Sequence, residues 1–289
     1  MSAGAEAGRS FAVRGAAQLR AGHPVRCRVL AFMLPALLAQ ASLAAWEDAP
    51  AVTALFEEAA VSGTFVLHDV TRGTDRGHAE ARARTRYVPA STFKIPNALI
   101  GLATGAVKSV DEPLPYRARE PAFMPEWERD MGLREAIRLS NVPIFQELAR
   151  RIGLPRMREH VARLDYGNRD IGSAVDRFWL DGPLAISALE QTRFLAGLAS
   201  GTLPVAVDAQ RAVREVLLVD SGPGWKLYAK TGWQHAPGAG VGWWVGWVEQ
   251  DGVLHAFALN MDIRDADDAP LRIALGRASL AALGLPGGP

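Results

Sequence analysis

The chain has 289 residues, 49% of them hydrophobic, so it can bury a large core, and disordered or fibrous classes are excluded. Its 32 basic and 31 acidic residues leave a formal net charge of +1, which gives no basic surface for nucleic acid or an anionic membrane. We therefore expect a small-molecule or peptide-like partner; no protein partner is implied.

The first 45 residues have the pattern of an export signal. Arginines at 20, 26 and 28 precede an apolar run at 29–39, and small residues follow up to Ala45. Pro35 breaks this run, which is shorter than the roughly 20 residues that span a membrane. We expect residues 1–45 to be a cleaved secretory signal and residues 46–289 to be one domain in the periplasm, without membrane contact.

No metal site is predicted. The single cysteine, Cys27, lies within the expected signal, which excludes disulfides and thiolate metal sites from the mature protein. The six histidines form no HExxH motif, and the acidic run at 265–268 lacks the glycine and terminal glutamate of a calcium loop.

The predicted elements begin with a helix at 51–60 and a strand at 64–70 that enters a turn-rich hairpin at 71–78. A helical section follows from 91 to about 200, with runs at 133–139 and 145–152 and a Gly- and Asp-rich interruption at 166–182. Three β-type runs, at 225–231, 242–248 and 253–261, precede a last helix at 271–283. Because strands adjacent in sequence near the C-terminus should pair antiparallel, this order predicts an α+β fold with a helical lobe, roughly 92–200, inserted between sheet segments.

The helical section opens with Ser91-Thr92-Phe93-Lys94, which places a serine hydroxyl and a lysine amine on the same face, one turn apart. Ser91 would lie in the first turn of the helix, where backbone N–H groups can hold an oxyanion. A Ser-x-x-Lys pattern alone occurs by chance. Lysine is rare in this chain, however, since 28 of the 32 basic residues are arginine, and lysine is the cation that can give up its proton.

Two further motifs make this pattern specific. Ser140-Asn141-Val142 lies in the helical section, and Lys230-Thr231-Gly232 ends an apolar strand. In this order they are the motifs of penicillin-interacting serine enzymes, which acylate a serine. Lys230 would supply a point charge and Thr231 a hydroxyl for a substrate carboxylate, and Gly232 a bare strand edge for substrate. The N–H groups of Ser91 and Trp233 would form the oxyanion hole.

Within that superfamily, the chain resembles the class D (oxacillinase-type) β-lactamases over nearly the whole expected mature chain. The resemblance rests on Ser140-Asn141-Val142, Tyr166-Gly167-Asn168, Phe178-Trp179-Leu180 and Trp243-Trp244-Val245-Gly246-Trp247. It implies the serine β-lactamase and penicillin-binding transpeptidase-like fold, with an antiparallel sheet flanked by helices and an all-helical lobe. It also implies hydrolysis of penicillin-type β-lactams through a serine acyl-enzyme.

The resemblance further implies that carbon dioxide carbamylates Lys94 to N6-carboxylysine, the general base, with no other cofactor. Carbamylation needs a neutral amine, and Phe93, Val142, Trp179 and Leu180 are available as the apolar lining that lowers a lysine pKa. By resemblance, the Trp179 indole N–H would hold a carbamate oxygen. Asp170 is the alternative base.

For several other residues, a purely structural role is an alternative to a role in catalysis or binding. Ser140 is expected to relay a proton between Lys230 and the β-lactam nitrogen, although it could merely cap a helix. Arg272 matches the family's carboxylate-binding arginine, with Arg264 as its rival, and either could be a solvated surface charge. The tryptophans at 243, 244 and 247 should pack in the core and supply one cleft wall. The sequence does not decide whether Met124 borders the substrate.

Two other functions remain open. A penicillin-binding DD-peptidase shares the motifs but deacylates β-lactams slowly, and it usually carries an anchor or extra domains. A β-lactam sensor domain resembles class D enzymes closely, but it must cross the membrane to signal, and the sequence shows no second hydrophobic span.

Overall fold

The computed structural model describes residues 12, 45–117, 122–235 and 240–287. The chain divides into Met1–Ser42 and Leu43–Pro289, and the helices and strands named below all belong to the second unit. The arginines, apolar run and Cys27 of the predicted export signal lie outside the described residues. Within those ranges, none of the helices is long and apolar enough to cross a membrane.

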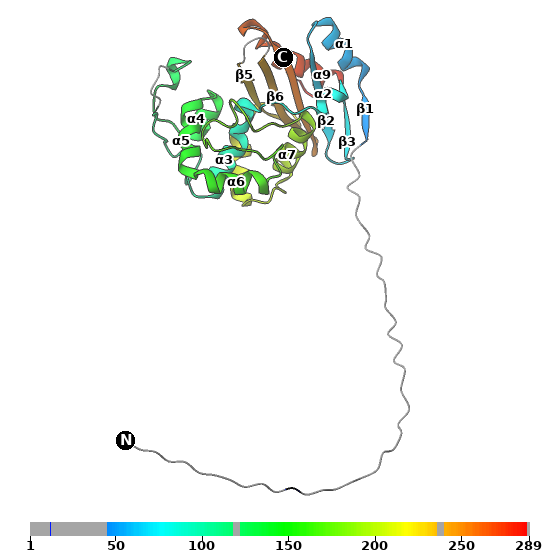
Figure 1. Cartoon of the computed structure of the whole chain (residues 1–289). Coiled ribbons are helices and arrows are strands. Elements are labelled where there is room, and N and C mark those ends of the chain that lie inside the picture. Colours follow the sequence, from blue (N-terminus) through cyan, green and yellow to red (C-terminus); the bar gives the residue numbers. More distant parts are fainter. Residues whose placement is uncertain (1–11, 13–44, 118–121, 236–239, 288–289) are drawn as a thin grey trace, which may run out of the picture. The chain divides into compact units, whose positions relative to one another are not determined.

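A sheet in the order β1-β3-β2-β7-β6-β5-β4 forms the centre of the fold (Figure 1). Its strands are β1 (Trp46–Asp48), β2 (Gly63–Asp69), β3 (Thr74–His78), β4 (Leu218–Gly222), β5 (Trp225–Gln234), β6 (Gly240–Gln250) and β7 (Val253–Ile263). Neighbouring strands are antiparallel, as predicted for the C-terminal three, except that β1 runs parallel to β3. The sheet is therefore mixed. β1 and β4 were not predicted, because both are short and largely exposed.

The helices of the first half are α1 (Pro50–Glu58), α2 (Glu80–Arg84), α3 (Lys94–Ala103), α4 (Leu133–Arg138) and α5 (Val142–Ile152). They are followed by α6 (Leu154–Arg163), α7 (Ala188–Ser200), α8 (Val207–Val216) and α9 (Leu271–Ala282). Short 3₁₀ turns are η1 (Ala90–Phe93), η2 (Pro125–Trp127) and η3 (Ala266–Asp268). The helix and hairpin predicted near the N-terminus are found as α1 and β2–β3, and the predicted last helix is found as α9. The irregular stretch at 166–182 is confirmed as well.

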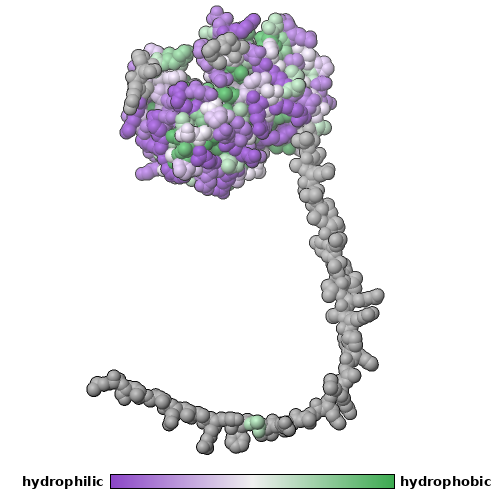
Figure 2. All heavy atoms as spheres, viewed as in Figure 1, coloured by the Kyte–Doolittle hydropathy of each residue, from purple (hydrophilic) through white to green (hydrophobic). Residues whose placement is uncertain are grey.

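Two hydrophobic cores lie on opposite faces of the sheet, because side chains alternate along each strand. Along β6, Trp243 and Trp247 belong to the core beneath the helical lobe, whereas Trp244 belongs to the core beneath α1 and α9. Figure 1 shows α1 and α9 on one side of the sheet and the lobe of α3 to α7 on the other. In the view of Figure 2, hydrophilic residues cover most of the surface, with small hydrophobic areas among them.

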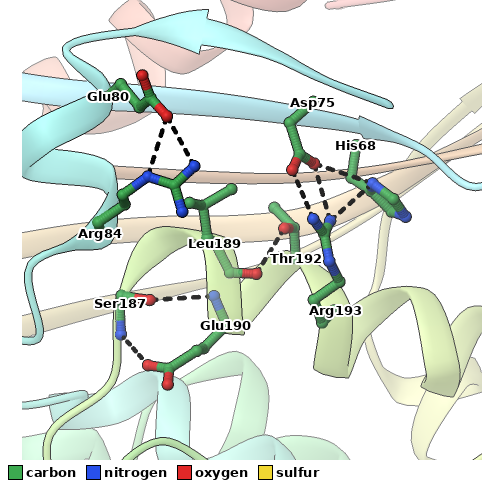
Figure 3. A network of polar contacts seen from close by, with 9 residues as sticks. All are labelled: His68, Asp75, Glu80, Arg84, Ser187, Leu189, Glu190, Thr192 and Arg193. Atoms are coloured by element: carbon green, nitrogen blue, oxygen red, sulfur yellow. Dashed lines mark hydrogen bonds and ion pairs between the residues drawn. The ribbon is translucent and has the colours of Figure 1, made fainter. Parts of the chain in front are cut away.

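Helix α7 is tied to the β2–β3 hairpin by a partly buried ion pair (Figure 3). The Arg193 guanidinium donates to both oxygens of Asp75, and Asp75 also bonds His68 Nδ1 at 3.0 Å. Asp75 is 2% exposed. The N-terminus of α7 carries a capping box, in which Ser187 accepts from the Glu190 N–H and Glu190 accepts from the Ser187 N–H. The helix is thus held at both its start and its middle.

Candidate active site

The turn that carries Ser91 is a 3₁₀ turn, η1, that continues directly into α3. The sequence predicted that Ser91 opens the α-helix itself, but the α-helix begins at Lys94. Ala90 has a left-handed backbone, with φ of 47°, which is costly for a residue with a Cβ atom. The Thr92 hydroxyl and N–H both donate to the Pro89 carbonyl, at 2.8 and 3.2 Å. Ser91 therefore sits on a strained and tightly bonded turn.

Lys94 lies directly behind Ser91, and its Nζ donates to Ser91 Oγ at 2.6 Å. The lysine is fully buried, and burial, followed by the charge of Lys230, lowers its pKa well below the usual value. Among the described residues, no carboxylate pairs with it, and the Phe145 ring lies 5.7 Å from Nζ. A lysine in this setting holds a neutral amine far more readily than an exposed lysine does.

Aromatic side chains pack around Phe93, the residue before Lys94. The Phe93 ring stacks on Trp179 at 5.5 Å and meets Phe178 and Tyr166 edge-on, at 5.0 and 5.6 Å. Trp179 is fully buried, and its indole Nε1 has no hydrogen-bond partner in the described part of the chain. A buried N–H donor without an acceptor costs free energy. The Trp179 Nε1 is therefore available to donate to an acceptor that is not among the described side chains.

Ser140 and Val142 reach the site from the start of α5. Ser140 has a left-handed backbone, with φ of 56°. The buried side chain of Asn141 accepts from the Ile144 N–H at 3.1 Å and donates to the Trp127 carbonyl at 3.1 Å, so it caps the helix and holds η2 against it. The capping role considered for Ser140 thus belongs to its neighbour, which leaves the Ser140 hydroxyl available to Lys230.

Lys230 is 6% exposed, and its Nζ lies 3.0 Å from Ser140 Oγ and 3.3 Å from Thr231 Oγ1. It also donates to the Thr231 carbonyl at 2.9 Å. Burial, with the charge of Arg272 as a smaller cause, lowers the pKa of Lys230 to about 7. Two lysines of lowered pKa therefore meet in one site, each beside a serine hydroxyl.

The end of β5 offers a strand edge to a ligand. On one side, Thr231, Gly232 and Trp233 pair with β6, whereas on the other the register with β4 stops at Tyr228. A Cβ atom at Gly232 would lie 3.0 Å from the Pro89 oxygen and 3.0 Å from Thr92 Cγ2. Glycine therefore lets the nucleophile turn lie directly against this edge.

The structure separates the two candidate arginines. Arg272, the second residue of α9, donates from Nη1 to the Gly232 carbonyl at 3.1 Å, and its Nε is buried without a partner among the described residues. Arg264 instead pairs with Asp268 at 3.3 Å, with a side chain 73% exposed. Arg272 lines the cleft, and Arg264 is absent from the described lining.

Several of these residues line a cleft of about 1600 Å³, whereas Lys94, Lys230 and Trp179 are absent from its described lining. Its lining includes Ser91, Ser140, Val142, Leu180, Thr231, Gly232, Trp233 and Arg272, together with Phe123, Met124 and Trp127. Met124, undecided from the sequence, thus borders the cleft. The volume of the cleft exceeds the roughly 300–1,000 Å³ common for small-molecule sites.

The three tryptophans of β6 were expected to pack in the core and to supply one cleft wall, and only the packing is found. None of the three tryptophans at 243, 244 and 247 belongs to the described lining of the cleft, because strand alternation buries each in one of the two cores. Asp170, the alternative base, is exposed, and its Oδ1 accepts from the Gly172 N–H at 3.0 Å, whereas Lys94 contacts Ser91 directly. The sequence did not reveal the roles of Asn141 and Phe145, although an asparagine before a Pro-containing helix start is a recognisable capping signal.

Comparison with known proteins gives a consistent result. The family model described as penicillin binding protein transpeptidase domain matches residues 63–278. The chain is 40% identical over 236 residues to β-lactamase OXA-10 of Pseudomonas aeruginosa, in a match that covers 81% of this chain and 88% of that protein. It is 38% identical over 253 residues to β-lactamase OXA-48 of Klebsiella pneumoniae, covering 86% of this chain and 95% of that protein.

The fold is similar to a solved structure as well. The class D β-lactamase FUS-1 (OXA-85) of Fusobacterium nucleatum subsp. polymorphum superposes with a TM-score of 0.78 and 39% identity. The match covers 80% of this chain and 96% of that one. The predicted transpeptidase-like fold is thereby confirmed.

Proposed function

Because the chain belongs to the penicillin-binding transpeptidase family and, within it, to the class D β-lactamases, we propose that it hydrolyses the β-lactam ring of penicillin-type antibiotics through an acyl-enzyme on Ser91. The observation that carries the mechanism is the buried contact of 2.6 Å between Lys94 Nζ and Ser91 Oγ. A hydroxyl next to a neutral, desolvated amine has a base within reach of its proton.

Lys94 is also suited to carbamylation by carbon dioxide. It has the low pKa that a neutral amine requires, and the buried Trp179 Nε1 supplies a donor for a carbamate oxygen. Carbamylation gives position 94 a carboxylate, which acts as the general base in both acylation and deacylation. Phe93, Val142 and Leu180 keep the surroundings apolar, so that water does not stabilise the ammonium form.

In acylation, position 94 accepts the Ser91 proton while Ser91 Oγ attacks the lactam carbonyl carbon. The oxygen of that carbonyl becomes an oxyanion, and the N–H groups of Ser91 and Trp233 donate to it. The lactam C–N bond then breaks, and the nitrogen takes a proton from Ser140, which Lys230 replaces across their 3.0 Å contact. The proton held at position 94 then returns to Lys230 by way of Ser140, which frees the base. The base takes a proton from a water molecule as that water attacks the ester, and Ser91 Oγ takes this proton back when the ring-opened acid leaves.

Substrate binding would use the end of β5. The side-chain amide of a penicillin can add to the open edge at Gly232 and Trp233 as a short strand. Its carboxylate would meet the hydroxyl of Thr231 and the charges of Lys230 and Arg272. The buried Arg272 Nε is a donor available for that purpose.

We also propose that residues 1–45 are removed on export and that residues 46–289 act as one domain in the periplasm, with no metal, protein or nucleic-acid partner. Mass spectrometry of the protein purified from the periplasm of an expressing bacterium tests this directly. A chain that begins near residue 46 supports the proposal, whereas an intact N-terminus contradicts it.

The first functional experiment is nitrocefin hydrolysis by the purified protein, with and without bicarbonate, beside a Lys94→Ala variant. Sustained turnover that bicarbonate increases, and that the variant lacks, supports a carbamate-dependent β-lactamase. A single stoichiometric burst instead indicates the alternative, a β-lactam sensor domain or a penicillin-binding DD-peptidase, because both retain the acylated serine.

A further inference from the structure

A chain of buried hydrogen bonds runs from α7 to the turn that carries Ser91. Gln191, in the first turn of α7, donates from Nε2 to Thr92 Oγ1 at 2.8 Å, and its Oε1 accepts from the Tyr166 hydroxyl at 3.4 Å. The Thr92 hydroxyl in turn donates to the Pro89 carbonyl at 2.8 Å. Gln191 is 1% exposed, and Thr92 and Tyr166 are fully buried.

Each member of this chain donates in the same direction, toward the turn. Burial raises the pKa of Tyr166, so its hydroxyl remains a donor at any physiological pH. Because the one hydroxyl proton of Thr92 is donated to Pro89, the Thr92 oxygen accepts from the amide nitrogen of Gln191, which leaves the Gln191 oxygen to accept from Tyr166. Aligned hydrogen bonds in a dry interior polarise one another, so the chain specifies one rotamer of Thr92.

The position of Thr92 controls the spacing of the nucleophile turn from β5. Thr92 follows Ser91, and its Cγ2 and backbone N lie 3.0 and 3.2 Å from where a Cβ atom of Gly232 would be. The two proposed oxyanion donors, the N–H groups of Ser91 and Trp233, belong to the residues next to this contact. The strained backbone at Ala90 adds a tendency to relax, which the bonds to Pro89 oppose.

We propose that Gln191 is a positioning residue, which acts through Thr92 to hold the Ser91 turn against Gly232 and so sets the geometry of the oxyanion hole. This inference rests on the proposed function, because the oxyanion hole is part of it. A shift of about 1 Å in such a site can cost on the order of 100-fold in rate, although the residue responsible touches no substrate.

The test compares two buried glutamines. Gln210, in α8, is also 1% exposed, but within the described chain its amide bonds the backbone of Leu203 and Val205 and no side chain. In Gln191→Met, single-turnover acylation by nitrocefin should slow about tenfold to 100-fold, while the dissociation constant of the first complex changes little. Gln210→Met should acylate at the wild-type rate, even where its melting temperature falls as far.

A second pair of variants addresses the case in which Gln191→Met does not fold. Thr92→Val keeps the shape of the side chain and removes the hydroxyl, so it should slow acylation, and Thr92→Ser should restore most of the rate. Thr192→Val is the control, because the hydroxyl of the buried Thr192 donates to the Leu189 carbonyl of its own helix.

Different failures have different meanings. A wild-type protein that nitrocefin does not acylate would overturn the proposed function, and this inference with it. A wild-type protein that is acylated, beside a Gln191→Met variant that acylates as fast as Gln210→Met, would overturn this inference alone. Thr92→Val that acylates as fast as wild type has the same consequence.

Discussion

Lys94 Nζ lies 2.6 Å from Ser91 Oγ, and the same lysine is fully shielded from solvent. A charged ammonium without a carboxylate partner is costly in such a place. Burial lowers the pKa of Lys94 and so favours the neutral amine, the form that carbamylation requires.

Carbamylation of Lys94 should be directly visible. Protein equilibrated with ¹³C-bicarbonate should show one carbamate carbon resonance, which Lys94→Ala lacks. The signal should weaken reversibly as the pH is lowered, because protonation of the amine releases carbon dioxide. A wild-type spectrum without a carbamate resonance would sink the proposal.

Trp179→Phe should weaken the carbamate without emptying the aromatic cluster. The phenyl ring keeps most of the packing against Phe93 but has no donor for a carbamate oxygen. Losing a hydrogen bond to a charged group costs about 1.5–3 kcal/mol, so about tenfold or more bicarbonate should be needed for half-maximal activity. Trp247→Phe is the control, because Trp247 is equally buried and its Nε1 bonds Glu249 at 3.3 Å. Equal bicarbonate dependence in both variants would contradict the role of Trp179.

Lys230 should give kcat/KM an alkaline limb. Its pKa in the free protein is lowered to about 7, so the ammonium is present below that pH and is lost as the pH rises through it. For a penicillin, whose carboxylate needs that charge, kcat/KM should fall above about pH 7. Lys230→Arg should lower kcat/KM at every pH, because a guanidinium cannot replace the Ser140 proton, but the remaining activity should lose this limb, because a guanidinium stays charged. Lys226→Arg, at an exposed position, should change neither. An unchanged limb in Lys230→Arg would assign it to another group.

Arg272→Ala should raise KM for benzylpenicillin about tenfold and change kcat less, because it removes a contact made equally in the bound substrate and the transition state. Arg264→Ala should leave both constants unchanged, since that side chain is exposed and paired with Asp268. Steady-state kinetics of the two variants show which arginine binds the substrate carboxylate. A larger rise in KM from Arg264→Ala than from Arg272→Ala would assign this role to Arg264.

Asp75→Asn should destabilise the fold by about 2 kcal/mol, less than the loss of a fully buried pair because Arg193 is 41% exposed. Burial alone would raise the pKa of Asp75, but the bonds from Arg193 and His68 outweigh it and hold the pKa below the usual value. A lowered carboxyl pKa stabilises the fold at neutral pH, and this contribution is lost as the pH falls through the folded-state pKa. Urea unfolding from about pH 6 to about pH 3 should thus show a shallower decline in Asp75→Asn than in wild type or in the exposed control Asp208→Asn.

Much of the architecture was predictable from local patterns. The three long strands of the C-terminal half and the last helix follow from apolar runs, and the motifs at Ser91, Ser140 and Lys230 identify the site. Sequence patterns could not predict which residues far apart in the chain contact one another. That Arg272 and not Arg264 reaches Gly232, and that Gln191 reaches Thr92 from α7, depends on tertiary placement, which no local periodicity encodes.

The misses have a common physical origin. β1 and β4 are short edge strands with little apolar content, so pairing rather than propensity makes them strands. The sequence alternation in β6 shows that Trp243 and Trp244 face opposite sides of the sheet. It does not show that each side is covered by a hydrophobic core, which is why the tryptophans were also expected to supply one cleft wall. The α-helix start at Lys94 rather than Ser91 reflects the tight turn at Pro89, a matter of backbone bonding that residue type does not reveal.

The two reactive lysines come from different parts of the fold: Lys94 belongs to the helical lobe and Lys230 to the sheet, with Ser140 between them in sequence. Neither lysine has a lowered pKa until the lobe and the sheet have closed over them. In the unfolded chain both lysines are solvated and carry ordinary ammonium groups, and Ser91 has no amine beside it. The Lys94–Ser91 and Lys230–Ser140 contacts therefore form only when the chain is folded.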